Sequence, residues 1–429
     1  MSTPSLLNIP YVIKAGTLYS QIPETGAGDF VVTRSASNAA TRINSLGFIE
    51  TVSDNIPRLD YPLGGAVNGC PALLVEPAAT NLARWVNQMT AQDTPAASGG
   101  MTVTTGSTDF LAPDGTSGSI TKYVGGAASG TSQYAYYTGG QVTASASGVH
   151  TFSLFVKRGA TNPLNFCALG IGNYDGGSGT TYSYFNLASG TALTAGASVQ
   201  DYGNGWYRLT TAPYTLAAGD LNGTLLFFMA EGNGDRSWPA SGALNLTAYT
   251  WGAQFEAGSV ATSYIPTTTA AVTRNADVIS ISGAVSGSIG QQSGTIYAEV
   301  DIRNAFAGTF ISLDIGSGAD FLIIGRTSGL AVMVQLRRSN GSVVNIITSS
   351  AVALGVHKIA LGYTNGDYAL YIDGVSAGTS TNSTDYPSAA LTRCGLAVTS
   401  YNIFNDRIRA AALYTTRLTD AQLAALTTP

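Results

Sequence analysis

Residues 56–84, IPRLDYPLGGAVNGCPALLVEPAATNLAR, fall into two parts. The first part places two opposite charges, Arg58 and Asp60, among apolar neighbours. In the second part a Gly-rich turn leads into the apolar run 72–75, which stops at Glu76 and a proline. An apolar run that is bounded by turn residues on one side and by Pro on the other predicts a short strand buried on both faces.

The PRLDY part of this stretch is interpreted as a docking element that holds the first unit of the chain to the second. Side chains alternate along an extended segment, so Arg58 and Asp60 are expected to point to the same side. A guanidinium and a carboxylate that are partly removed from water form a shape-specific pair, whereas two solvated charges are the alternative. The residues expected to serve structural docking are Arg58, Asp60, Tyr61, Glu76 and Asn81.

The composition indicates an ordered, multidomain β protein. A chain of 429 residues is too long for one ordinary core, so two or three domains are expected. With 45% hydrophobic and only 10% charged residues, the chain buries enough apolar surface to offset its ordering entropy. Its 51 Gly and 22 Tyr, found in short alternating runs, are typical of an all-β protein with many turns.

Charge and cysteine content exclude several classes of function. A net charge of −5 argues against a nucleic-acid-binding role. No signal peptide is recognised and no segment approaches the length of a membrane span, so no membrane insertion is expected. Cys70, Cys167 and Cys394 are odd in number and far apart, so we expect small buried thiols rather than disulfides or a metal site.

Turn signals and alternation divide the chain into three units. Residues 1–95 form a small N-terminal docking segment that cannot fold alone, with strands expected at 29–34, 41–44 and 48–50. Residues 96–278 form a jelly-roll domain that ends in an extended linker, 258–278, lying flat along a surface. Its strands are expected at 150–158, 183–187, 199–202, 206–209, 225–229 and 248–256.

Residues 279–429 form the third unit, a second sandwich. Residues 296–303 alternate between apolar and polar, which predicts a half-buried strand. Asn365-Gly366 and Asp373-Gly374 lie between alternating runs and predict two hairpins. Thr419 and Gln422 form a capping box that opens one short helix. The predicted fold class is therefore all-β, with two antiparallel β-sandwich domains after a small extended N-terminal docking segment.

Three sets of motifs resemble known families. ATRINSLGFIE (40–50), PRLDY and CPALLVEPAATNL (70–82) resemble the N-terminal module of a family of tailed-bacteriophage virion proteins. FSLFVK, DYGNGWYRL, TWGAQFEAG and ATSYIPT resemble, in that order, the carbohydrate-binding-module-like sandwich of phage tail proteins. YTNGDYALYIDG (363–374) and AAALYTTRLTDAQLAAL (410–426) resemble the concanavalin A/laminin-G-like sandwich.

These resemblances imply a non-enzymatic virion protein, made in the host cytoplasm and exposed on the particle surface. A tail-fibre or receptor-binding component would contact host-surface carbohydrate, besides other virion proteins. A capsid-decoration, head-fibre or collar subunit with a purely structural role is the alternative, and a polysaccharide depolymerase is a third. Such fibres are commonly homo-oligomers, often trimers, but no heptads set a trimer here.

Candidate ligand contacts are aromatic residues with polar neighbours, because sugar rings stack on Trp and Tyr while their rims need hydrogen-bond partners. Trp206 and Trp251 lie inside strand motifs and are expected in the core. Trp238 instead lies in a Gly-rich polar loop, where a sheet core does not need it. The candidates for contact with a glycan or partner are Trp238, Arg236, Asp235, Asn233 and Tyr207.

Signals for catalysis and for metal binding are weak. His150 and His357 have no nucleophile motif nearby and are expected to be structural. A depolymerase needs two facing carboxylates, which spacing alone does not reveal among 25 scattered acidic residues. Asp109, Asp114 and Asp175 could bind calcium, but Asp residues are also common in turns, so no catalytic residue, metal or cofactor is assigned.

Overall fold

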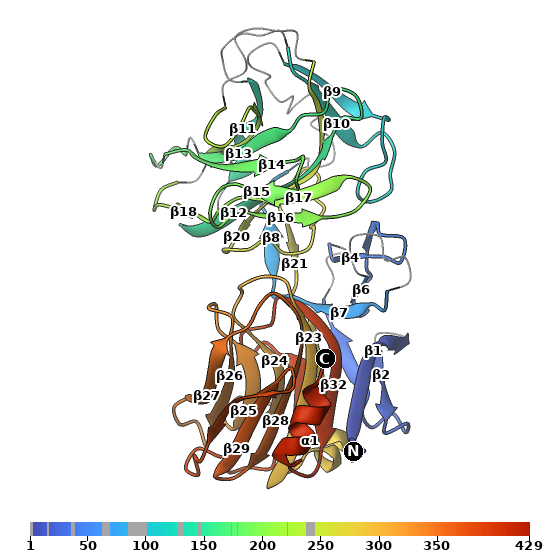
Figure 1. Cartoon of the computed structure of the whole chain (residues 1–429), viewed down its shortest axis with the longest axis vertical. Helices are drawn as coiled ribbons and strands as arrows, with labels where there is room; N and C mark the ends of the chain where they lie inside the picture. Colours follow the sequence, from blue (N-terminus) through green and yellow to red (C-terminus); the bar gives the residue numbers. More distant parts are fainter. Residues whose placement is uncertain are drawn as a thin grey trace.

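The computed structural model describes residues 3–14, 17–35, 39–61, 69–84, 101–126, 133–143, 147–172, 174–177, 179–220, 222–236 and 245–429. Figure 1 shows two β bodies stacked along the long axis, with the chain termini on the body formed by the C-terminal part. The ladders between named strands are antiparallel. The prediction of an all-β chain built on antiparallel sandwiches is therefore confirmed.

The C-terminal body is built on a 16-stranded sheet. Its main path runs in the order β27 (Val344–Ala351), β26 (Ala331–Arg337), β25 (Phe321–Arg326), β24 (Gly308–Asp314), β31 (Arg393–Ala397), β22 (Val278–Ser282), β3 (Phe30–Thr33), β2 (Thr17–Ile22), β1 (Leu6–Lys14), β32 (Asp406–Tyr414), β23 (Ser293–Ile302), β28 (Gly355–Thr364), β29 (Asp367–Ile372) and β30 (Val375–Ser380). The N-terminal strands thus join the two halves of this sheet, since β3 pairs with β22 and β1 pairs with β32.

The short strand that was predicted within residues 56–84 also belongs to this body. The apolar run forms β7 (Ala72–Val75), which is buried along its whole length as predicted. It pairs with β32 on one side and with β6 (Leu59–Asp60) on the other. The expected N-terminal docking segment therefore contributes strands to the C-terminal sheet. It is not attached only to the jelly roll that follows it in the chain.

The strand β23 is covered on both faces, which corrects the prediction of a half-buried strand. Ile296 and Val300 face the main core, but Tyr297 on the opposite face is only 8% exposed. Helix α1 (Asp420–Thr427) covers that face, and its Leu423 is fully buried against Tyr297 and its neighbours. The predicted capping box is confirmed, because Thr419 and Gln422 exchange both hydrogen bonds.

The second body is a sandwich of two sheets around one apolar core. One sheet has the order β16 (Ser198–Asp201), β17 (Trp206–Thr210), β12 (Gly148–Arg158), β20 (Thr247–Ala257), β10 (Ile120–Val124) and β9 (Thr102–Ser107), with β18 (Tyr214–Leu216) beside β12. The other has the order β11 (Gln133–Thr143), β19 (Asn222–Ala230), β13 (Phe166–Gly172), β14 (Thr181–Asn186) and β15 (Thr191–Ala192). The six strands predicted in this unit are confirmed.

The segment 258–278 does not lie flat on a surface, which corrects the expectation for this linker. Tyr264 and Ile265 are buried, and Tyr264 packs against Phe155 and Trp251 of the jelly roll. The segment also supplies β21 (Val272–Arg274), which pairs with β8 (Ala79–Asn81) between the two bodies (Figure 1). Phe155 lies on the face of β12 opposite Phe152 and Leu154, and Tyr264 covers that face, so both faces of the strand are buried.

Two small elements complete the junction and the third unit. The hairpin β4 (Thr41–Ile43) and β5 (Ile49–Thr51) forms as predicted and lies between the bodies (Figure 1). A 3-10 helix, η1 (Ala284–Ser288), follows β22. Within the described ranges no helix is long and apolar enough to cross a membrane.

Candidate functional site

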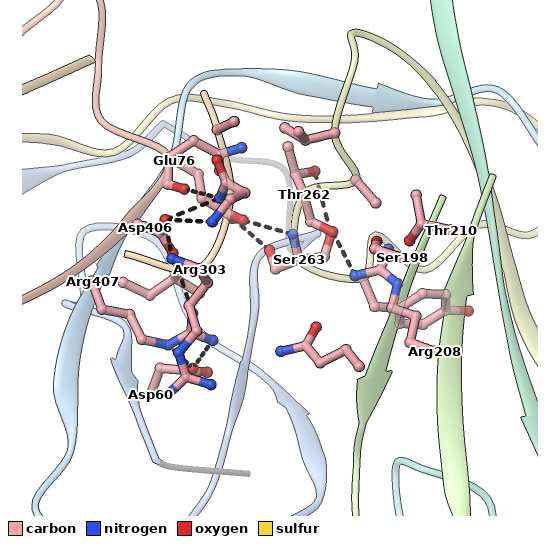
Figure 2. A pocket seen from close by; sticks show the side chains of 18 of the residues that line it. Asp60, Glu76, Ser198, Arg208, Thr210, Thr262, Ser263, Arg303, Asp406 and Arg407 are labelled. Carbon is pink, nitrogen blue, oxygen red and sulfur yellow. Dashed lines mark hydrogen bonds and ion pairs between the residues drawn. The ribbon is translucent and has the colours of Figure 1, made fainter. Parts of the chain in front are cut away.

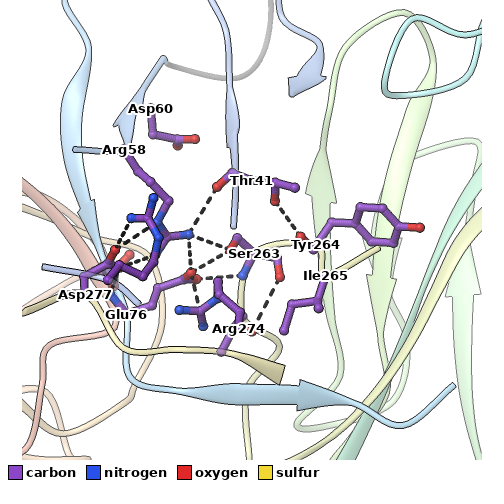
Figure 3. Close-up of polar contacts among 12 residues, drawn as sticks. Thr41, Arg58, Asp60, Glu76, Ser263, Tyr264, Ile265, Arg274 and Asp277 are labelled. Carbon is purple, nitrogen blue, oxygen red and sulfur yellow. Dashed lines mark hydrogen bonds and ion pairs between the residues drawn. The ribbon is translucent and has the colours of Figure 1, made fainter. Parts of the chain in front are cut away.

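The centre of the junction between the two bodies is the buried side chain of Arg58, which is 1% exposed. Its Nη1 donates to Glu76 Oε2 at 2.7 Å, to Ser263 Oγ at 2.8 Å and to the carbonyl of Thr41 at 3.1 Å. Its Nε and Nη2 donate to the carboxylate of Asp277. Figure 3 shows these groups converging from segments far apart in the sequence. One guanidinium therefore binds the N-terminal unit to the segment between the two sandwiches.

Two further arginines complete what we call the junction cluster, defined as Arg34, Arg58, Glu76, Arg274 and Asp277. Arg34 Nη1 lies 2.8 Å from Asp277 Oδ1, and Arg274 Nη2 lies 3.4 Å from Glu76 Oε2. Burial acts to raise the pKa of Glu76, but Arg274, Arg58 and the hydrogen bonds from Ser263 outweigh it and hold that pKa well below its ordinary value. The carboxylate of Glu76 is therefore ionised over the whole neutral range.

A cluster of this kind fixes geometry more than it adds stability. Taking charges out of water is costly, and the attraction within the cluster offsets that cost only while every partner is present. Removing one partner of a buried pair leaves an uncompensated charge and costs about 3–5 kcal/mol. The segments that supply the junction cluster must therefore stay together for its charges to remain compensated.

Asp60, the second charge of the PRLDY motif, pairs with the far end of the chain. Its Oδ2 lies 2.7 Å from Nε of Arg407, and its Oδ1 accepts from the backbone N–H of Ile43 at 2.6 Å. Arg58 and Asp60 are thus both buried, which excludes two solvated charges, and each has its own partners rather than the other. Asp60 contacts the third unit, whereas Arg58, through Ser263 and Asp277, contacts the segment that follows the jelly roll.

The other predicted docking residues contact the jelly roll. Tyr61 is half-buried against its core. Asn81 is fully buried and donates to the carbonyls of Ala253 and Ile265 at 3.2 and 2.9 Å. The structure therefore brings Arg58 and Glu76 into one cluster, and places Asp60, Tyr61 and Asn81 in separate contacts around it.

A cleft of about 860 Å³ opens beside the junction cluster, between the jelly roll and the C-terminal body. Figure 2 shows Arg208 and Thr210 of β17 on one side of it and Arg303 and Asp406 on the other. The polar residues of its two walls include Ser198, Gln200, Asp201, Arg208, Thr210, Thr211, Arg303, Asn304, Ser328, Asn405, Asp406 and Arg407. Hydroxyl, amide and guanidinium groups from both bodies therefore face one space.

Asp406 is a buried acid of this cleft whose pKa is raised. Burial raises its pKa to about 7, although Arg407 and the N–H of Arg303 act in the opposite direction. Its Oδ2 accepts from the backbone N–H of Arg303 at 2.7 Å, and from the backbone and side-chain N–H groups of Asn304 at 3.2 and 3.1 Å. Three donors thus hold this oxygen in place.

Arg208 is a buried cation in the jelly-roll wall. It is 4% exposed, and its guanidinium donates to the carbonyl of Thr262 at 2.6 Å and to Ser153 Oγ at 3.0 Å. Among the residues that the structure describes, no carboxylate forms an ion pair with it. The wall therefore carries a positive charge whose direct partners are neutral oxygens.

The predicted ligand contacts that the structure describes, namely Asn233, Asp235, Arg236 and Tyr207, are not among the residues that line this cleft. Trp238 lies outside the described residues. Asn233 and Asp235 are exposed in the turn after β19, and the guanidinium of Arg236 stacks 3.5 Å over the ring of Tyr182. Tyr207 lies on β17 of the other sheet, with its ring against Gly190. The structure therefore groups Asn233, Asp235 and Arg236 on one turn and places Tyr207 apart from them.

The two tryptophans that were expected in the core and the two histidines that were expected to be structural have contacts of those kinds. Trp206 and Trp251 are each 2% exposed, which confirms their core placement. His150 stacks on Phe255, and His357 pairs with Asp373 at 2.6 Å. These histidine contacts agree with a structural role.

One cysteine prediction is wrong and two are confirmed. Cys167 and Cys394 are buried, as expected, but Cys70 is exposed and lies before β7, which begins at Ala72. The three Asp residues considered for calcium have protein partners: Asp109 pairs with Lys122, Asp114 bonds Thr116 and Asp175 bonds Asn222. In the described part of the chain, no three His, Cys, Asp or Glu side chains cluster as metal ligands.

Comparisons with known proteins give distant structural similarities. No protein-family model matches the chain, and no curated protein matches it. A carbohydrate-binding module (CBM40) of the Ruminococcus gnavus IT-sialidase, solved with alpha2,3 sialyllactose, is 18% identical, with 34% of this chain and 88% of that chain covered and a TM-score of 0.28. The binding domain of botulinum neurotoxin DC, in complex with rat synaptotagmin II, is 15% identical over 35% of this chain and 40% of that chain (TM-score 0.29).

A third similarity is to the heptameric SAP-like pentraxin of Limulus polyphemus, which is 13% identical over 31% of this chain and 68% of that chain (TM-score 0.25). At these identities and TM-scores the similarities assign neither a ligand nor a family to this chain.

Proposed function

We propose that this chain is a non-catalytic component of a tailed-phage particle, exposed on its surface, whose central cleft contacts host-surface glycans. The phage origin rests on the resemblance of residues 40–50, 57–61 and 70–82 to phage virion modules. The observation that carries the glycan-binding role is the cleft of about 860 Å³ whose two walls come from different sandwiches. The tail-fibre or receptor-binding form of this role is preferred to a purely structural one because hydroxyl, amide and guanidinium groups of both bodies line that cleft.

The chemistry of the walls suits a sugar ligand. Sugars present many hydroxyl groups that need donors and acceptors at close range, and binding sites supply a few well-placed polar groups for this purpose. Ser198 and Gln200 offer such groups from β16, and Arg303 offers a partly exposed guanidinium from the opposite body. A glycan held by both walls would gain from their fixed separation, because a preorganised site loses little entropy on binding.

The junction cluster and the Asp60–Arg407 pair supply that fixed separation. Asp60 and Arg407 join the N-terminal unit to β32, while Arg58 and Ser263 join it to the segment that follows the jelly roll. Asn81 then holds β8 against the jelly roll itself. The same N-terminal unit therefore contacts both walls of the cleft, so it acts as a spacer between them.

The carboxylates of the cleft suit binding better than turnover. Glycoside hydrolysis needs one carboxyl group that gives up a proton and a second that acts as base or nucleophile. Asp60 is paired with Arg407, and Glu76 with Arg58. Asp406 is 2% exposed and accepts three N–H groups at one oxygen, so its proton is not presented to a ligand.

One observation nevertheless favours a depolymerase as the second candidate. A carboxyl group with a pKa of about 7 is half protonated at neutral pH, as a general acid requires, and Asp406 has that property. Asp201 is an exposed carboxylate of the opposite wall. Release of reducing sugar from a bound polysaccharide, lost in the Asp406→Asn variant while binding persists, would establish this function and overturn the non-catalytic one.

The test of the preferred function is a glycan array and a host-cell binding assay with the purified full-length chain. Binding to at least one class of surface glycan is expected, and it should be unchanged in the control Thr379→Ala, an exposed position on β30 away from the cleft. An array and a panel of host cells that both stay blank would contradict it. Labelling of the protein on the phage particle then distinguishes the receptor-binding role from the decoration role. Signal at the tail tip agrees with the first, and signal on the capsid agrees with the second.

A further inference from the structure

A second, smaller hollow lies where the loop of the β4–β5 hairpin meets the jelly roll. Its volume is about 300 Å³, at the lower end of the range for small-molecule sites. It is separate from the turn that carries Asn233, Asp235 and Arg236. The residues that line it are Gly47, Phe48, Phe110, Leu111, Ala112, Pro113, Lys157, Tyr202, Gly203, Asn204 and Trp206.

The aromatic walls of this hollow are held in place by specific contacts. The ring of Phe110 meets Tyr249 edge to face, with centroids 5.0 Å apart. Trp206 Nε1 donates to the carbonyl of Leu111 at 2.9 Å, which fixes the segment that carries Phe110. Phe48 lies against Gly115, where a Cβ atom would come within 3.3 Å of its ring. The walls are therefore preorganised rather than loosely packed.

Polar groups lie among these rings. The ammonium group of Lys157 lies 4.4 Å from the centroid of the Phe110 ring and donates to the carbonyl of Asn204. Asn204 has a positive φ of 51° in the turn between β16 and β17, and its side chain is exposed. Flat apolar walls with a cation and an amide beside them match a sugar ring, whose C–H face is apolar and whose rim carries hydroxyl groups.

Tyr202 borders both this hollow and the central cleft. Its half-buried side chain lines both spaces, because it lies at the end of β16 next to the turn that carries Asn204. A chain of sugar rings in the cleft that continues past Tyr202 would therefore reach the aromatic hollow. A single monosaccharide would fill only one of the two spaces.

We infer that the aromatic hollow is a subsite for one further sugar ring of the glycan bound in the central cleft, so that the ligand is an oligosaccharide rather than a terminal monosaccharide. This inference rests on the proposed glycan-binding function and adds to it the length of the ligand. Phe48 and Phe110 provide the apolar contact surface, with Lys157 lying over the Phe110 ring, and the amide of Asn204 provides a hydrogen-bond partner at the rim.

The test measures affinity against glycan length by calorimetry. The probes are linear oligomers of one to six sugar units, prepared from the array glycan that the wild type binds. The wild type should bind long oligomers more tightly than short ones. Phe110→Ala should weaken binding of the long oligomers by roughly three- to tenfold, the value of one aromatic stacking contact, and leave that of the short ones unchanged.

Asn204→Gly serves as the second variant, because glycine tolerates the positive φ at this position and the fold is therefore retained. It should also weaken binding of long oligomers only. If the wild type binds oligomers of every length equally, or if both variants bind like the wild type, the subsite is overturned while the glycan-binding function stands. If the wild type binds no glycan, both proposals fail together.

Discussion

Asp60 and Arg407 form an ion pair across 347 residues of sequence, with 2.7 Å between Asp60 Oδ2 and Arg407 Nε. Both side chains are largely buried, at 2% and 13% exposure. The pair joins β6, in the stretch with the clearest sequence motif, to the second residue of the last strand, β32. The N-terminal unit is thereby fixed to the C-terminal body beside the central cleft.

The first prediction concerns this pair. Arg407→Ala should lower the free energy of unfolding by about 3–5 kcal/mol, because it leaves the buried carboxylate of Asp60 without its counter-ion. Arg409→Ala is the matched control on the same strand, since its partner Glu299 lies in a more exposed pair that is worth about 0–1 kcal/mol. Urea denaturation of both variants checks the difference. Equal losses in the two variants would show that the buried pair has no special role.

The second prediction concerns the pH dependence of stability. Glu76 has a folded-state pKa held below the ordinary value of 4.5. Its contribution to the free energy of unfolding is therefore present above pH 4.5 and is lost as the pH falls below that value. The unfolded chain takes up a proton at Glu76 in that range and the folded chain does not. Wild-type stability should therefore fall as the pH drops below 4.5.

Glu76→Gln should be less stable at neutral pH by about 3–5 kcal/mol, since it leaves Arg58 and Arg274 under-compensated. It should also lose less further stability in acid, because the group that titrates is gone. Denaturation curves at a series of pH values give both quantities. If the free energy of unfolding changes with pH in parallel for the variant and the wild type, the lowered pKa of Glu76 in the folded chain is ruled out.

The third prediction concerns the cysteines. A thiol reagent should label Cys70 in the native chain, because it is exposed, and leave Cys167 and Cys394 unmodified. Burial also raises the pKa of both buried thiols, which lowers their content of the reactive thiolate. Mass spectrometry after labelling, with and without denaturant, identifies the modified residues. Native labelling of Cys167 or Cys394 would contradict the packing described for the two cores.

The fourth prediction concerns helix α1, which covers the outer face of β23. Thr419→Ala should destabilise the chain by about 1 kcal/mol, the usual cost of losing an N-cap. Thr415→Ala, at an exposed position shortly before the helix, should change stability by less than about 0.5 kcal/mol. Thermal denaturation compares the two, and equal effects would speak against the capping role of Thr419.

Local features of the fold were predictable from the sequence. The capping box at Thr419 and the Asn-Gly and Asp-Gly turns depend on residues within four positions of each other, so spacing reveals them. The strand β7 was recognisable because Glu76 and Pro77 end an unbroken apolar run. In each case the cause of the structure lies within the segment itself.

The site depended on contacts that no local spacing encodes. Asp277 is 219 residues from Arg58, and nothing near either residue marks the other as its partner. The face of β12 that carries Phe155 appears exposed by alternation, because the Tyr264 that covers it comes from the segment expected to lie on a surface. The cleft likewise consists of residues from all three units, so it arises only after the units pack.

Binding of the array glycan by cleft variants tests the central claim, namely that both sandwiches hold one glycan without cleaving it. Calorimetry should show that Gln200→Ala in the jelly-roll wall and Arg303→Ala in the opposite wall each weaken binding several-fold, while the glycan is recovered at its original length. Unchanged affinity in either variant, or release of reducing ends by the wild type, would contradict the account.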